Sequence, residues 1–179
     1  MTDNPYDWNN REKSIQVLVL GIGNPIMEDD AAGLELLKLV RESRQWPDDV
    51  VFEDGATLAM ALLPAIEDAR AVLFLDAMRT GAAPGTVLRR KKEELPGFFA
   101  RVMSAHEIGL HQVLAAANLR RSLPEWMEMV GIEAANTRCV YPMGEEVKNA
   151  LPEATDLAIE RIEALLTLCK TDKEDMANA

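Results

Sequence analysis

The sequence has few of the residues that usually build metal and redox sites, because its 179 residues include only two cysteines and two histidines. Cys139 and Cys169 are far apart, so they form neither a CxxC redox pair nor a cysteine-rich zinc motif. We expect both to be reduced structural thiols, with Cys169 on the apolar stripe of a helix. The cysteines therefore predict no zinc or disulfide framework.

Basic residues and long apolar runs are scarce as well. The 19 Lys and Arg against 30 Asp and Glu leave a net charge of −11, which disfavours binding to nucleic acid or to an anionic membrane surface. No apolar run approaches the roughly 20 residues that span a bilayer, and the start, MTDNPYDWNNREK, lacks the hydrophobic core of a signal peptide. These absences predict a cytoplasmic protein without a membrane partner, and we expect a monomer.

The organisation of the chain predicts one domain. Residues 1–14 and 171–179 are polar and lack periodicity, which is typical of terminal tails. Residues 15–170 contain no repeat, low-complexity tract or Gly/Ser linker. A span of this length can bury a core of its own without disulfides.

The first half of the domain alternates short apolar runs with helix-like stretches. The runs are residues 16–20, 50–52 and 71–75, and amphipathic stretches at about 30–40 and 58–69 separate them. Pro64 predicts a kink or a restart in the second stretch. This alternation predicts a single α/β domain with a twisted, mostly parallel sheet flanked by helices on both faces.

The second half is less regular. It predicts a strand over 86–90, possible as an antiparallel edge, a helix over 108–119 and a strand over 127–132. A last helix is expected from about Pro152, as a first-turn residue, to about Lys170.

An aspartate follows each of the first three apolar runs: Asp30 after the first loop, Asp54 after the second run and Asp76 directly after the third. The carboxyl ends of parallel strands share one edge of a sheet, which is where ligands bind in open α/β folds. Asp30 could instead cap a helix, and Asp54 could be a turn residue. Asp76 is harder to explain structurally, because a carboxylate at the buried end of a strand is costly.

The first loop resembles a dinucleotide-binding turn only in part. Gly21 and Gly23 match the first two glycines of GxGxxG, but Ile26 stands at the third position. The acids at 28–30 would repel a pyrophosphate at the start of the following helix. They are better suited to holding a cation.

The two histidines cannot form a ligand pair on one helix face. His106 and His111 are five residues apart, which corresponds to a rotation of about 500°. His106 precedes the helical run and could face the sheet edge, whereas His111 falls within it. Together with the aspartates, His106 completes an oxygen and nitrogen set that suits a divalent transition metal. Ser104 and Cys139 are weak candidates for a nucleophile, because neither has a recognisable base or elbow motif around it.

Five motifs in order now indicate a known family. They are GxGNPxxxDDxxG from Gly21, DGxT from Asp54, LDA from Leu75, APGT from Ala83 and SxHxxGL from Ser104. Together they resemble the hydrogenase maturation endopeptidases, which trim the C-terminus of the large subunit of nickel-iron hydrogenases. The resemblance covers about residues 15–170.

The resemblance implies an endopeptidase that acts on the large-subunit precursor after nickel insertion, with no organic cofactor. It assigns Asp30, Asp76 and His106 as ligands of a nickel ion that the substrate carries. Asp54 lies near this site by the same analogy, and either the metal polarises the scissile carbonyl or a carboxylate such as Asp54 activates water. Many members have Glu in place of Asp30, and glycine is common in place of Ala31.

Two other functions are compatible with parts of the sequence. A maturation chaperone could sense nickel without cutting, and a nucleotide-binding enzyme could use a related α/β fold. The acidic first loop argues against the nucleotide. Which hydrogenase isoenzyme supplies the substrate stays open at this point.

Overall fold

The computed structural model describes residues 13–55, 59–95, 105–137 and 142–177, and its centre is a five-stranded sheet. The strand order is β2-β1-β3-β5-β4, and every pairing is parallel except that of β4 with β5. The strands are β1 Ile15–Gly21, β2 Val50–Asp54, β3 Ala69–Met78, β4 Val87–Lys91 and β5 Trp126–Glu133. The predicted α/β class and the antiparallel edge strand are confirmed.

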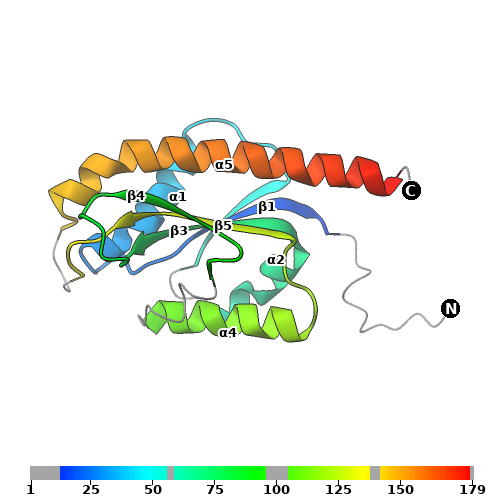
Figure 1. Cartoon of the computed structure of the whole chain (residues 1–179), viewed down its shortest axis with the longest axis horizontal. Helices are drawn as coiled ribbons and strands as arrows, with labels where there is room; N and C mark the ends of the chain where they lie inside the picture. The colour runs from blue at the N-terminus through cyan, green and yellow to red at the C-terminus, as the bar shows by residue number, and fades with distance from the viewer. Residues whose placement is uncertain (1–12, 56–58, 96–104, 138–141, 178–179) are drawn as a thin grey trace.

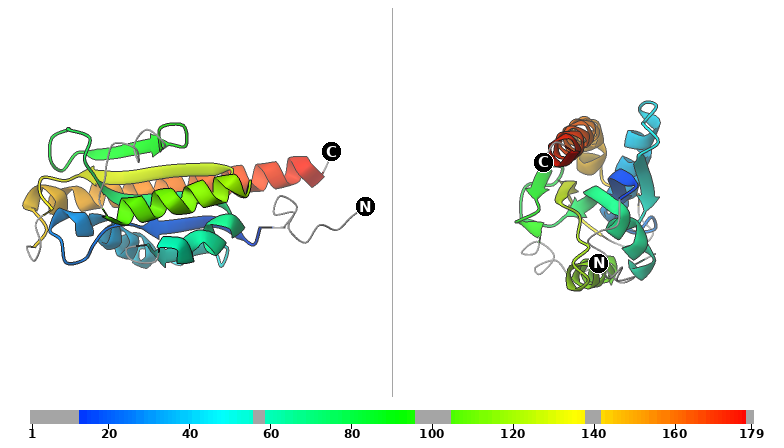
Figure 2. Two further views of the ribbon diagram at one scale, coloured as in Figure 1. Left: turned by 90° about the horizontal axis from the view of Figure 1, so that it is seen from below. Right: turned by 90° about the vertical axis from the view of Figure 1, so that its right-hand side faces the viewer.

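Helices cover both faces of this sheet (Figures 1 and 2). Helices α1 (Ala32–Glu42) and α5 (Glu145–Ala177) pack on one face, and α2 (Leu63–Asp68) and α4 (Ala105–Leu119) pack on the other. The short 3-10 helices η2 (Asp29–Ala31) and η3 (Ala59–Leu62) precede α1 and α2. Within the described ranges, no helix combines the length and the apolar character that a membrane crossing needs.

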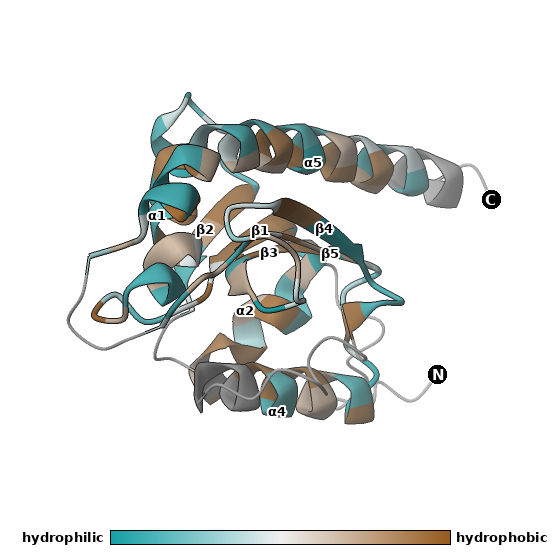
Figure 3. Cartoon of the chain, turned by 60° about the vertical axis from the view of Figure 1, so that its left-hand side comes forward, coloured by the Kyte–Doolittle hydropathy of each residue, from teal (hydrophilic) through white to brown (hydrophobic). Residues whose placement is uncertain are grey.

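The central strands are buried on both sides, as their continuous apolar runs predict. Val17 and Val19 of β1 face α1 and α5, whereas Leu18 and Leu20 face α2 and α4. Figure 3 shows the apolar strands enclosed between helices whose outer sides are polar. The sheet thus contributes to two separate apolar layers of the core.

The route of the chain creates a topological switch point at the carboxyl edge of the sheet. From β1 the chain passes through α1 to β2 on one side, and then through α2 to β3 on the other side of β1. The connections on the two sides therefore diverge between β1 and β3. In open α/β sheets this switch point is where ligands bind.

Two strands extend beyond their predicted ends. β3 continues to Met78, so Asp76 lies inside the strand, where it pairs with Gly131 of β5. β2 includes Asp54 as its last residue, opposite Gly21. The extension of β3 is stabilised by β5 alone, because β1 stops at Gly21 opposite Leu75. Asp76 therefore stands just past the end of β1.

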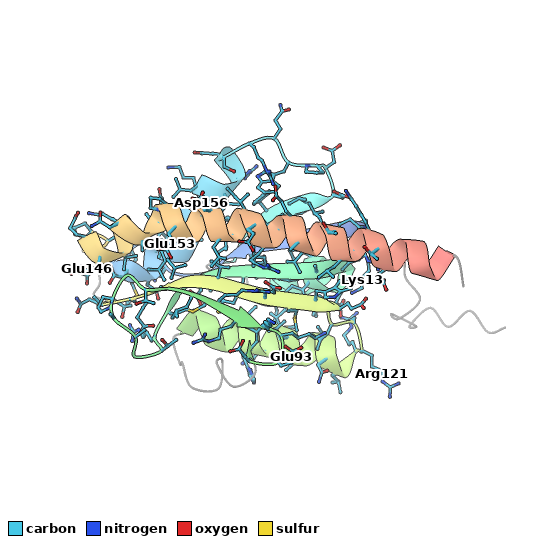
Figure 4. The ribbon with its side chains drawn as sticks, turned by 45° about the horizontal axis from the view of Figure 1, so that its top comes forward. Lys13, Glu93, Arg121, Glu146, Glu153 and Asp156 are labelled. Carbon is cyan, nitrogen blue, oxygen red and sulfur yellow. The ribbon has the colours of Figure 1, made fainter. Side chains whose placement is uncertain are left out.

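The last helix is longer than predicted at both ends. It begins at Glu145 and ends at Ala177, so Pro152 lies inside it and most of the expected tail at 171–179 is helical. The turn before Pro152 is held by buried Val147 and Ala150, and the exposed proline ring faces solvent. Near the other end, an ion pair joins Asp172 to Arg70 of β3. Glu146, Glu153 and Asp156 are exposed along α5 (Figure 4).

Cys169 occupies the core side of α5, as its place on the apolar stripe predicts. It is a free thiol, fully buried, with Sγ 3.4 Å from the carbonyl oxygen of Gln16. Burial raises the pKa of this thiol to about 11. Cys139 lies outside the described residues.

A buried ion cluster ties three elements together on the α5 face. Glu128 of β5 accepts hydrogen bonds from Arg89 of β4 and Arg161 of α5, the shortest at 2.6 Å to the Arg89 guanidinium. Burial alone would raise the pKa of Glu128, but the hydrogen bonds from both arginines outweigh it and hold the pKa below its usual value. The cluster therefore needs an ionised Glu128.

Glu128→Gln should lower the free energy of unfolding by about 3 kcal/mol near neutral pH, because it leaves two arginines without their shared carboxylate. A carboxyl whose pKa is lowered on folding contributes fully above its unfolded pKa and loses that contribution as the pH falls through its folded pKa. The difference from the parent protein should therefore shrink below about pH 4. Urea denaturation across pH measures it.

The exposed acid Glu163, which pairs with Arg44, provides the matched control. Glu163→Gln should change stability by less than about 1 kcal/mol. A loss for Glu128→Gln that stayed constant down to acidic pH would contradict the role of its charge.

Candidate functional site

The loop after β1 folds back on itself and brings Asp30 beside Gly23. Gly23 has φ +134°, and a Cβ there would lie 1.9 Å from the carbonyl oxygen of Asp30, so only glycine fits. The Asp30 carboxylate accepts a hydrogen bond of 2.9 Å from the backbone N–H of Asn24 and is 7% exposed. The glycine-rich turn thus lets the backbone of Asp30 approach closely, and the N–H of Asn24 holds its carboxylate.

Its neighbour Asp29 is fully buried, and its carboxylate faces backbone N–H groups. One carboxylate oxygen accepts N–H bonds from Ala135 and Asn136 at 2.9 and 3.0 Å, and the other accepts one from Gly144 at 2.8 Å. These donors belong to the segments after β5 and before α5. Asp29 is therefore a structural carboxylate that joins three segments at the carboxyl edge.

Helix α1 makes an unusually close approach to the ends of β1 and β3. A Cβ on Gly33 would lie 2.1 Å from the carbonyl oxygen of Ile22 and 2.9 Å from Cα of Asp76. The N–H of Ile22 in turn donates a 2.8 Å bond to the carbonyl of Leu75. This packing sets the loop that carries Asp30 directly against the part of β3 that carries Asp76.

Asp76 is almost completely enclosed, with 1% of its surface exposed. One of its carboxylate oxygens accepts a 2.8 Å bond from the N–H of Ala77. Its side chain shares a face of β3 with Phe74 and Met78, which pack in the layer beneath α4. Asp76 therefore belongs to the α4 side of the switch point.

His106 lies in the first turn of α4, which begins at Ala105. Figure 1 shows that α4 starts at the end of the molecule where the parallel strands terminate. The backbone thus places His106 at the carboxyl edge, on the same face as Asp76. The side chain of His106 and all of Ser104 lie outside the described part of the structure, while His111 is exposed on the helix.

Asp54 reaches the same edge but on the opposite face. It is exposed at the end of β2, and together with Phe52 and Leu37 it lines a hollow beside α1. Two strand spacings, about 10 Å, separate β2 from β3. The structure therefore brings Asp30 and Asp76 to the switch point and leaves Asp54 at its margin.

Carboxylates such as those of Asp30 and Asp76 are hard oxygen donors of the kind that bind divalent cations. Among the side chains that are described, no three Asp, Glu, His or Cys residues are close enough to hold a metal ion by themselves. A site for a transition metal would also need a nitrogen donor. The backbone places His106 at the start of α4, on this edge.

The fold and the placement of its acids define an open α/β protein with two buried carboxylates at its topological switch point. Comparison with known proteins specifies it further, because the sequence model of the family described as "Hydrogenase maturation protease" matches residues 13–161. The chain belongs to the hydrogenase maturation protease family.

Individual relatives agree with this assignment. The hydrogenase expression/formation protein HupD of Rhodobacter capsulatus is 32% identical over 148 residues, which cover 82% of this chain and 69% of that protein. The hydrogenase 2 maturation protease of Escherichia coli is 32% identical over 119 residues, covering 66% of this chain and 73% of its own length.

Solved structures show the same fold. The hydrogenase maturating endopeptidase HybD from Escherichia coli superimposes with a TM-score of 0.75 at 29% identity, covering 84% of this chain and 91% of that one. The family resemblance and the fold class predicted from the sequence are thus confirmed.

Two structural acids at this edge are not recognisable in the sequence. An Asp-Asp pair does not indicate which carboxylate faces backbone, so the sequence leaves the role of Asp29 open. Glu133 is 3% exposed and accepts bonds from the N–H and Oγ1 of Thr80 and the N–H of Gly81, which fixes the loop after β3. The sequence signal for Glu133 is its position at the end of an apolar run.

The contrast between the two adjacent acids is testable. Asp29→Asn should lower the free energy of unfolding by about 2–4 kcal/mol, since an amide has one acceptor oxygen and its NH₂ faces backbone donors. Asp30→Asn should stay within about 1 kcal/mol of the parent, because its amide oxygen can still accept from Asn24. Chemical denaturation of both variants measures the difference, and equal losses would reject the division of roles.

Proposed function

We propose that the protein is an endopeptidase that removes the C-terminal extension from the nickel-loaded large-subunit precursor of a nickel-iron hydrogenase. Membership of the hydrogenase maturation protease family supports the peptidase activity. The observation that carries the proposal at this site is Asp76, a carboxylate that is 1% exposed at the topological switch point. Burying a charge there is costly, which favours a functional reason for keeping it.

In this proposal the nickel ion is part of the substrate. Asp30, Asp76 and His106 bind it, and this contact both verifies that the precursor is loaded and aligns its scissile bond. Two oxygen donors and one imidazole nitrogen suit a borderline divalent transition metal. Asp30 has a shorter side chain than the glutamate that many family members carry at this position. It would therefore hold the ion closer to the loop backbone.

Hydrolysis needs an activated water or a polarised carbonyl. The exposed carboxylate of Asp54 can accept a proton from water, and its place at the same edge of the sheet fits that role. The substrate's nickel can polarise the carbonyl instead. We further propose that the protein acts in the cytoplasm as a monomer.

Asp76→Asn and His106→Ala should each reduce cleavage of a nickel-loaded precursor by more than about 100-fold while leaving the fold intact, because each removes one ligand. His111→Ala, which changes the other, exposed histidine, is the matched control and should cleave normally. Intact-mass measurement of the precursor before and after incubation gives the readout.

Normal trimming by Asp76→Asn or His106→Ala would overturn the ligand assignment. A parent protein that binds the loaded precursor but leaves its extension attached would instead indicate the nickel-sensing chaperone. Circular dichroism spectra and melting temperatures of the variants that match those of the parent exclude a folding defect as the cause.

Asp54→Asn distinguishes the two hydrolytic routes. If Asp54 is the base, kcat should fall by about 100-fold or more with little change in KM. Single-turnover cleavage across pH measures this step. A kcat within about threefold of the parent would assign the activation to the substrate's metal.

A further inference from the structure

A groove runs along the outer edge of β2, between that strand and α1. Its floor is apolar, formed by Leu34 and Leu37 of α1 and Phe52 of β2, and Asp54 closes it at the carboxyl edge. A second hollow continues it towards the amino edge, past Arg41, Arg44 and Trp46. We call the two hollows together the β2 groove.

The strand beside this groove is an edge strand. Within the described ranges, β2 pairs with β1 on one side and with no strand on the other. Such an edge presents backbone N–H and C=O groups that an extended peptide can pair with, while its alternate side chains enter adjacent hollows. Five residues of β2 offer about 17 Å of such pairing.

The two ends of the β2 groove differ in charge. Asp54 stands at the carboxyl end, and the guanidinium groups of Arg41 and Arg44 stand towards the amino end. Arg44 is engaged already, since it stacks 4.0 Å over the Trp46 ring and pairs with Glu163. Arg41 lines both hollows, is exposed and forms no ion pair with any described residue.

The acids Glu42 and Asp48 also border the amino end. The amino end of the groove therefore carries no general positive potential. What distinguishes the amino end is the guanidinium of Arg41, which has no ion-pair partner among the described residues and suits one carboxylate rather than a polyanion.

On this basis, and resting on the proposed function, we propose that the C-terminal extension of the precursor binds in the β2 groove as an added strand antiparallel to β2. Its apolar side chains lie on Leu34, Leu37 and Phe52. Its terminal carboxylate accepts hydrogen bonds from Arg41.

The direction follows from the two ends. The bond to be cut is held at the carboxyl edge, so the extension leaves that edge and runs towards the amino edge, against the direction of β2. The segment to be removed ends by definition in an α-carboxylate, the group that the Arg41 guanidinium would bind. From β3 to a strand added outside β2 the peptide crosses three strand spacings, about 14 Å, a span of about four extended residues.

The test uses the charge reversal Arg41→Glu and the milder Arg41→Gln, with Lys170→Glu on exposed α5 as a control of equal charge change. Cleavage of the nickel-loaded precursor should show KM raised about tenfold for Arg41→Glu, with kcat within about twofold. Lys170→Glu should match the parent in both constants.

A second measurement uses peptides with the sequence of the extension. The peptide with a free carboxylate should inhibit the parent at least about fivefold better than its C-terminal amide, because only the carboxylate forms the charge-assisted bond. This preference should disappear in Arg41→Gln. Hydrogen exchange should show slowed backbone amides at residues 50–54 when the free-acid peptide is present.

Equal inhibition by both peptides, together with unchanged exchange at 50–54, would overturn the proposal even if the parent cleaves the precursor normally. Protection of the β2 amides that face away from β1, in the absence of peptide, would also overturn the proposal, since it would indicate that another segment or a second copy of the chain occupies the edge. Analytical ultracentrifugation separates these two cases. Failure of the parent to cleave would refute the proposed function instead.

Discussion

The carboxylate of Asp29 is the constraint on which the carboxyl edge depends. Its three backbone hydrogen bonds hold together the loop after β1, the segment after β5 and the segment before α5, although these are remote in sequence. Charge-assisted bonds to backbone N–H groups are strong inside a protein, and here they fix the position of the adjacent Asp30. One acid of the pair thus provides the geometry in which the other can act.

The same region shows why a helix can begin so close to two strands. Gly33 lets α1 rest on the carbonyls of Ile22 and Leu75, which no residue with a Cβ would allow. Asp30 and Asp76 become neighbours through backbone contact, and their separation is therefore set by main-chain packing. A site defined in this way is rigid, which suits the selective recognition proposed for it.

Much of this architecture could be predicted from the sequence. The runs around Val19 and Leu73 are apolar enough to specify buried parallel strands, and the aspartates that follow them predicted the carboxyl edge. The end predicted for β3, at Leu75, is wrong, because the extension of the strand depends on pairing with β5. The partners there are remote in sequence, since Asp76 pairs with Gly131, 55 residues further along the chain. The start predicted for α5, near Pro152, is also wrong. A proline is favourable in the first turn of a helix, but Val147 and Ala150 pack on the core and extend the helix beyond it towards the N-terminus. The face on which Asp54 lies could not be predicted either, since it depends on the register of β2 against β1.

The buried thiol of Cys169 has a consequence for a protein that would handle another protein's metal. Thiolates are strong ligands for late transition metals, and a cysteine must lose its proton to bind one. With its pKa raised to about 11 and its sulfur enclosed beneath α5, this thiol stays protonated and out of reach at physiological pH. It therefore cannot act as a competing ligand for the nickel of the proposed substrate.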